Sequence, residues 1–149
     1  MKKCFHLFSG EQGKDVALLL LRIALGGVFL AHGVQKLMGM DGVIQFFGMI
    51  GFSPLVAWFV AIIETVIGIA MIAGVMTNVA AWLMVIILIV AIVKVHLTKG
   101  FWSVGGGYEY QLFMILSAIA VAHLGHGSYA LCKHKEGEKC GSCDNCAVK

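Results

Sequence analysis

The stretch LVAWFVAIIETVIGIAMIAGVM, residues 55–76, decides the fold class of this chain. Its 22 residues include one charged side chain, Glu64. A helix of about 20 apolar residues crosses the roughly 30 Å hydrocarbon core of a bilayer, whereas the strands of a membrane barrel would alternate in polarity. The stretch therefore predicts a membrane-spanning helix.

Three more apolar runs of helix length lie around it, at residues 16–37, 79–97 and 110–131. We expect an all-α integral membrane four-helix bundle over residues 16–131, between an N-terminal segment, 1–15, and a short polar, Cys-rich tail, 132–149. The composition agrees, because 60% of the residues are hydrophobic and only 13% are charged, against roughly 25% charged in soluble domains. Arg22 lies within the first run and no clear cleavage site follows it, so we expect a retained helix rather than a signal peptide.

The distribution of lysines predicts the orientation of the bundle. With four spans, seven lysines fall on the side of the two termini and three on the opposite side. The positive-inside rule then places both termini in the cytoplasm and the protein in the cell inner membrane, as a multi-pass protein.

The connections between the runs predict where helices begin. Ser53 and Pro54 are typical of an N-cap and a first helical residue, and Thr77 or Asn78 can cap the run at 79–97. The apolar segment 40–52 is too short to span. We expect it in the interface or folded back as a lid, and a merely apolar loop is the alternative.

Glu64 is the most informative single residue, because it lies near the predicted bilayer midplane. A charged side chain there costs at least about 2.5–3.5 kcal/mol, which favours an inward orientation with a partner or a proton. Ala57, Ala61 and Gly68 share its helical face and predict close packing of another helix.

The depth of each cation suggests possible partners for Glu64. Lys94 lies at the most similar depth, within roughly 6 Å by the helical rise. Arg22 lies about two turns from the cytoplasmic end of its run, so it either reaches Glu64 or extends back to the headgroups.

Several further ionisable residues end their runs at the outer level. We expect a polar chamber there, with Glu64 as its floor and walls formed by His32, Lys36, Lys94, His96 and Glu109. Each of these side chains could instead only anchor its helix to headgroups. Burial disfavours the charged forms of such groups, so a chamber of this kind suits coupled proton exchange, as at a quinone. His32 and His96 could ligate a haem, but we do not expect one, because both lie near span ends and neither has a haem motif.

The tail contains four cysteines in a C-x7-C-x2-C-x2-C pattern: Cys132, Cys140, Cys143 and Cys146. In a reducing cytoplasm this pattern favours a Zn²⁺ or iron–sulfur site, with Cys4 or His134 as further ligands. Exchangeable thiols and an unordered tail are the alternatives. If the orientation is reversed, disulfides become the better interpretation.

The order of the polar motifs resembles the DoxX family of small four-helix membrane proteins. The resemblance rests on five motifs along residues 16–131: Leu19-Leu20-Leu21-Arg22, His32-Gly33-Val34-Gln35-Lys36, Glu64 with Gly68, Val95-His96, and Gly106-Gly107-Tyr108-Glu109. Where the resemblance leads us to expect Gly-Pro-Gly, this chain has Gly125-His126-Gly127, so the last helix could end differently.

The resemblance implies a DoxX-like bundle that acts as a subunit of a quinone- or thiol-linked membrane oxidoreductase, since related DoxD proteins belong to thiosulfate:quinone oxidoreductases. It also marks Arg22, His32, Lys36, Glu64, His96 and Glu109 as characteristic positions. The expected partners are membrane lipid, a redox partner protein and a second copy of the chain, but not nucleic acid. The rival hypothesis is a non-catalytic membrane subunit or small ion-binding transporter.

Overall fold

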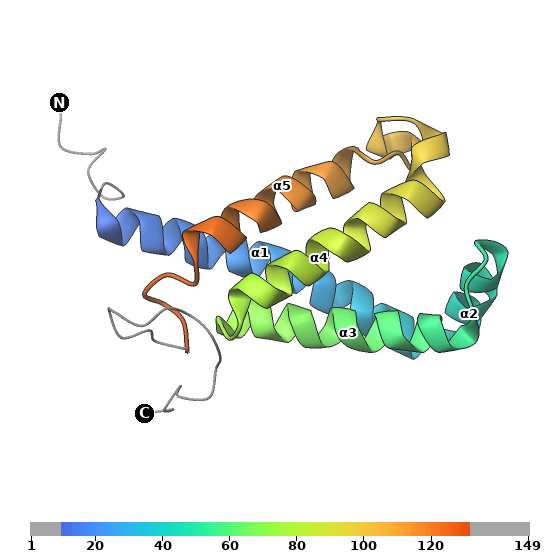
Figure 1. Ribbon diagram of the computed structural model, residues 1–149, viewed down its shortest axis with the longest axis horizontal. Helices are drawn as coiled ribbons and strands as arrows, with labels where there is room; N and C mark the ends of the chain where they lie inside the picture. Colours follow the sequence, from blue (N-terminus) through green and yellow to red (C-terminus); the bar gives the residue numbers. More distant parts are fainter. Residues whose placement is uncertain (1–9, 132–149) are drawn as a thin grey trace.

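The computed structural model describes residues 10–131, and this part of the chain contains helices and no strand (Figure 1). The prediction of an all-α membrane protein is confirmed. Its five α-helices are α1 (Glu11–Met38), α2 (Met40–Met49), α3 (Pro54–Ala73), α4 (Thr77–Ala91) and α5 (Glu109–Leu124). Three stretches are long and apolar enough to span a membrane: α1, α3, and α4 with its continuation to Lys99.

The helices form two antiparallel pairs, α1 with α3 and α4 with α5 (Figure 1). We call the end where α1 begins and α5 ends the terminal end, and the opposite end the α2 end. At the α2 end, α4 continues into a π-helical segment, η1 (Ile92–His96), and two short 3₁₀ turns, η2 (Leu97–Lys99) and η3 (Ser103–Gly105), lead to α5.

The fourth predicted helix is shorter than its apolar run. The run extends to Leu131, but α5 ends at Leu124, and its 16 residues measure about 24 Å. Gly125 and Gly127 adopt positive φ angles of 82° and 68°, which end the helix. The chain then turns back under the bundle, where the Leu131 N–H donates to the carbonyl of Ala73 at 3.1 Å.

The helix starts agree only in part with the predicted caps. Pro54 is the first residue of α3, as expected, although Ser53 makes no side-chain capping bond. The prediction that Thr77 or Asn78 caps α4 is wrong, because Met76 is the N-cap, with φ 48°, and Thr77 is already helical. The link, residues 74–76, lies earlier in the chain than the sequence suggested, because α3 ends at Ala73 and α4 begins at Thr77.

Small residues bring α1 and α3 into backbone contact. A Cβ added at Gly68 would lie 2.6 Å from the amide nitrogen of Leu30, and one at Gly26 would lie 2.7 Å from the carbonyl oxygen of Gly68. Ala57 and Ala61, closer to the α2 end, are fully buried under the short helix α2. The segment 40–52 is therefore largely a helix packed against α3 and not a loop.

Candidate functional site

Glu64 lies at the middle of α3, and only 5% of its surface is exposed. Its Oε2 forms an ion pair with the Nζ of Lys36, the third residue from the end of α1. Close helix packing creates this contact, because Gly33 lies directly against Thr65 and Lys36 follows one turn later. Of the predicted chamber residues, these two are brought together.

Lys94, the partner favoured by depth, does not pair with Glu64. Its side chain is exposed, and its Nζ lies 5.3 Å from the centre of the Phe52 ring, a cation–π contact that joins η1 to the link between α2 and α3. The helical rise predicts the depth of Lys94 along its own helix. It does not predict which helix faces are in contact.

Arg22 lies near the terminal end and neither reaches Glu64 nor extends to the headgroups. It is 1% exposed, and its guanidinium donates to four carbonyls: Nε to Met71 at 3.1 Å, Nη2 to Ile72 at 2.9 Å, and Nη1 to His126 at 2.7 Å and Tyr129 at 3.1 Å. Two of these carbonyls belong to the last turn of α3, where backbone acceptors lack helical partners. Arg22 therefore binds the end of α3 to the segment after α5.

His96 ends the π-helical segment, and its ring lies between two hydrogen-bond partners. Its Nδ1 is 2.6 Å from the carbonyl oxygen of Gly106, and its Nε2 is 3.0 Å from the Nε2 of Gln111. Because a carbonyl can only accept, Nδ1 carries the proton, and in the neutral ring Nε2 accepts from the Gln111 amide. The structure therefore defines one tautomer of His96.

Gln111 is a candidate that the sequence analysis missed. Its Oε1 is buried and has no hydrogen-bond partner within the described part of the chain. An unsatisfied buried acceptor costs about 1–3 kcal/mol, so buried polar atoms are rarely left without a hydrogen-bond partner. The available signal was that Gln111 carries the only amide side chain in the run 110–131.

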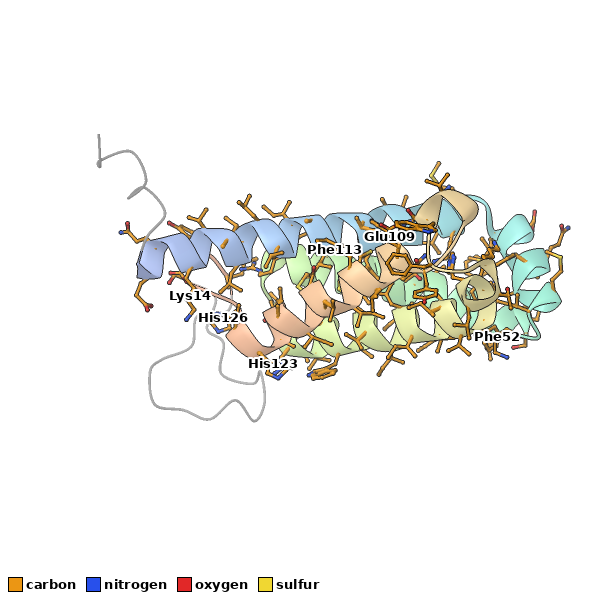
Figure 2. The ribbon with its side chains drawn as sticks, turned by 90° about the horizontal axis from the view of Figure 1, so that it is seen from above. Lys14, Phe52, Glu109, Phe113, His123 and His126 are labelled. Atoms are coloured by element: carbon orange, nitrogen blue, oxygen red, sulfur yellow. The ribbon has the colours of Figure 1, made fainter. Side chains whose placement is uncertain are left out.

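The remaining predicted chamber residues, Glu109 and His32, differ in their surroundings. Glu109 accepts hydrogen bonds at its Oε2 from the backbone and hydroxyl of Ser103, both at 3.1 Å. It borders an apolar groove of about 440 Å³ that continues along α5 past Phe113 (Figure 2). His32 is exposed on α1. The side-chain contacts at the α2 end thus include a Lys36–Glu64 pair and a His96–Gln111 group.

The four cysteines of the predicted metal site, Cys132, Cys140, Cys143 and Cys146, lie outside the described residues. Within residues 10–131 no cluster of three or more His, Cys, Asp or Glu side chains could hold a metal ion.

Comparisons with known proteins identify the family of the chain. The DoxX family profile matches residues 17–97. A Bacillus subtilis (strain 168) protein named "Putative oxidoreductase CatD" is 36% identical over 117 residues, which cover 78% of this chain and 85% of that protein. No solved structure matches. The family profile covers more than half of the chain, and we conclude that this protein belongs to the DoxX family.

Proposed function

We propose that the protein is a subunit of a quinone- or thiol-linked oxidoreductase system in the cell inner membrane, with both termini in the cytoplasm. The buried Lys36–Glu64 ion pair is the observation that carries the proposal. Ionisable groups inside membrane helices are costly, and those that occur commonly mark ion or proton pathways. The name of the Bacillus subtilis relative supports a redox role.

The pair provides a place to hold one proton within the spanning helices. Transfer of a proton from the Nζ of Lys36 to the Oε2 of Glu64 converts two charges into two neutral groups, which a low-dielectric environment favours. Lys36 has 25% of its side chain exposed, so it is the member through which a proton can exchange with the surroundings. The proposed proton-exchanging group is therefore Glu64, with Lys36 as its immediate donor.

The donors and acceptors at the α2 end fit a quinone as the redox partner. A bound quinone would accept two electrons and two protons, and it is soluble in the membrane. The unpartnered Oε1 of Gln111 is an acceptor for a quinol hydroxyl, and His96 holds the Gln111 amide through its Nε2. His96 is thus a positioning residue in this proposal, and Gln111 is the residue that binds the hydroxyl.

Titration of the purified protein with a short-chain quinone and the corresponding hydroquinone tests the proposal. Wild type should bind both forms, and Glu64→Gln and His96→Ala should each weaken binding of at least one form by about tenfold, the loss of about one good hydrogen bond. Asp41→Asn, an exposed carboxylate on α2, is the control and should bind as wild type does.

Two results would overturn it. Wild type that binds neither form would exclude a quinone site. Unchanged binding in both Glu64→Gln and His96→Ala would assign these residues to structure alone and would favour a non-catalytic subunit or a small transporter.

A metal site in the tail is a separate proposal. Cys132, Cys140, Cys143 and Cys146 would hold a Zn²⁺ ion or an iron–sulfur cluster. Metal analysis of the purified full chain should find stoichiometric metal in wild type and none in the Cys140→Ser/Cys143→Ser variant.

A further inference from the structure

A groove of about 380 Å³ lies at the terminal end, between the beginning of α1 and the segment that follows α5. Lys14 and His126 approach each other from these two elements (Figure 2). The groove is lined by Lys14, Asp15, Leu18, Leu124, His126, Gly127 and Ser128. It is far from the Lys36–Glu64 pair and plays no part in the proposed redox function.

The groove contains two opposite charges, Lys14 and Asp15, which are neighbours in the chain. Within residues 10–131 the only salt bridge joins Lys36 to Glu64, so neither Lys14 nor Asp15 forms one there, and the two charges attract each other without direct contact. Charges this close to a spanning segment are usually paired or solvated by headgroups. The groove is thus complementary to a ligand that carries both signs of charge.

Ser128 holds the Asp15 carboxylate in place. Its backbone N–H donates to Oδ1 at 3.1 Å, and its hydroxyl donates to Oδ2. A carboxylate has about four acceptor sites, so each oxygen keeps a free lone pair. The contact therefore orients Asp15 without using up its capacity to bind a cation.

The apolar lining of the groove faces the spanning parts of the helices. Leu18 is buried one turn inside α1 from Lys14, and Leu124 is the exposed last residue of α5. Polarity thus decreases from the terminal end toward the middle of the bundle. The expected ligand has a charged head at the level where the apolar runs begin and end, and an apolar chain that enters the bilayer.

We propose that this groove binds the headgroup of a phospholipid with a primary ammonium group, as in phosphatidylethanolamine. The ammonium donates hydrogen bonds to Asp15, the phosphate lies beside Lys14, and an acyl chain follows Leu18 and Leu124. A trimethylammonium headgroup has no N–H donor for Asp15. A purely anionic headgroup is repelled by the same carboxylate, so both bind more weakly.

Native mass spectrometry of the detergent-purified full chain tests the site. Phosphatidylethanolamine, phosphatidylcholine and phosphatidylglycerol with identical acyl chains are offered at equal concentration. Wild type should retain the ethanolamine lipid at least about fivefold more than either competitor, a difference of roughly 1 kcal/mol. Equal retention of all three would overturn the proposal, and preference for the glycerol lipid would show a merely cationic surface.

Variants separate the groove from general lipid binding. Asp15→Asn should remove the preference for ethanolamine over glycerol headgroups, and Lys14→Gln should lower retention of all three lipids. Lys99→Gln changes an exposed lysine at the α2 end and should behave as wild type. Ser128→Ala keeps both charges and should weaken the preference by releasing the Asp15 carboxylate. If Lys14→Gln and Asp15→Asn match Lys99→Gln, the groove is not the site.

Discussion

A carboxylate in the middle of a membrane helix needs a compensating partner, and Glu64 finds it in Lys36. The two residues differ in exposure, since 6% of the Glu64 side chain is exposed but 25% of the Lys36 side chain is. A long lysine side chain can redirect its ammonium toward water when it loses its partner, while a buried carboxylate in a helix centre cannot. The two members of the pair therefore contribute unequally to stability.

We expect Lys36→Met to destabilise the protein by about 3–5 kcal/mol, because it leaves Glu64 buried and unpaired. Glu64→Gln should cost less, about 1–3 kcal/mol, because the amide is neutral and Lys36 can move. Unfolding free energies in mixed micelles with increasing denaturing detergent measure both changes. The double variant should be less destabilised than the sum of the two. Additive effects would show that the two side chains do not interact.

At the scale of the elements, the contact between α1 and α3 depends on glycines that allow the backbones to touch. Gly26 and Gly33 on α1 and Gly68 on α3 form this contact. Membrane helices associate without a hydrophobic driving force, so close van der Waals packing carries more of the stability than it would in water. The same contact sets the distance across which Lys36 meets Glu64.

Gly68→Ala should therefore destabilise the protein by about 1–3 kcal/mol, because its Cβ would meet the backbone of Leu30, which cannot move aside as a side chain can. Gly27→Ala is the matched control on α1, since nothing lies within 4 Å of the added Cβ. It should be neutral or stabilising by up to about 1 kcal/mol, through helix propensity. Thermal unfolding in micelles compares the two. Equal effects would contradict a packing role for Gly68.

The sequence was sufficient to predict the elements whose signal is local. Apolar length located α1, α3 and α4, and Pro54 marked the start of α3 correctly. The end of α5 could be predicted only from the two glycines after Leu124, because the apolar run itself continues beyond them. The π-helical turn at Ile92–His96 has no comparable local signature in the sequence.

The sequence predicted which ionisable residues belong to the candidate site, but it did not predict which of them form an ion pair. Glu64 and Lys36 were both expected, yet depth along single helices favoured Lys94 as the partner. Pairing depends on which helix faces touch, and that follows from the glycine contact between α1 and α3. Gln111 was missed because its significance comes from an unpartnered atom, which is a property of the folded structure.

At the scale of the whole molecule, the two helix pairs are joined differently at their two ends. At the α2 end, Lys94 contacts Phe52 through a cation–π interaction. At the terminal end, the single guanidinium of Arg22 holds carbonyls from α3 and from the segment 126–129. Arg22 therefore connects α1, α3 and the chain after α5 without a carboxylate partner among the described residues. Its guanidinium also lies beside Gly74, in the link between α3 and α4.

Loss of this connection should loosen the terminal end and leave the α2 end intact. We expect Arg22→Met to accelerate amide hydrogen exchange in residues 125–131 by about tenfold or more, because four carbonyls lose their donor and each such bond contributes about 1 kcal/mol. The N–H of Leu131, bonded to Ala73, is the most direct reporter. Exchange in residues 103–112 should stay as in wild type, so these residues are the internal control.

Arg22→Lys distinguishes geometry from charge at the same position. A lysine keeps the positive charge, but its three N–H donors share one nitrogen. They cannot reach all four carbonyls that surround the planar guanidinium of Arg22 in wild type. It should therefore behave more like Arg22→Met than like wild type. If Arg22→Lys exchanges as slowly as wild type, a buried charge near the end of α3 suffices. If exchange accelerates equally in 103–112 and 125–131, Arg22 supports the whole bundle and does not act as a local connection at its terminal end.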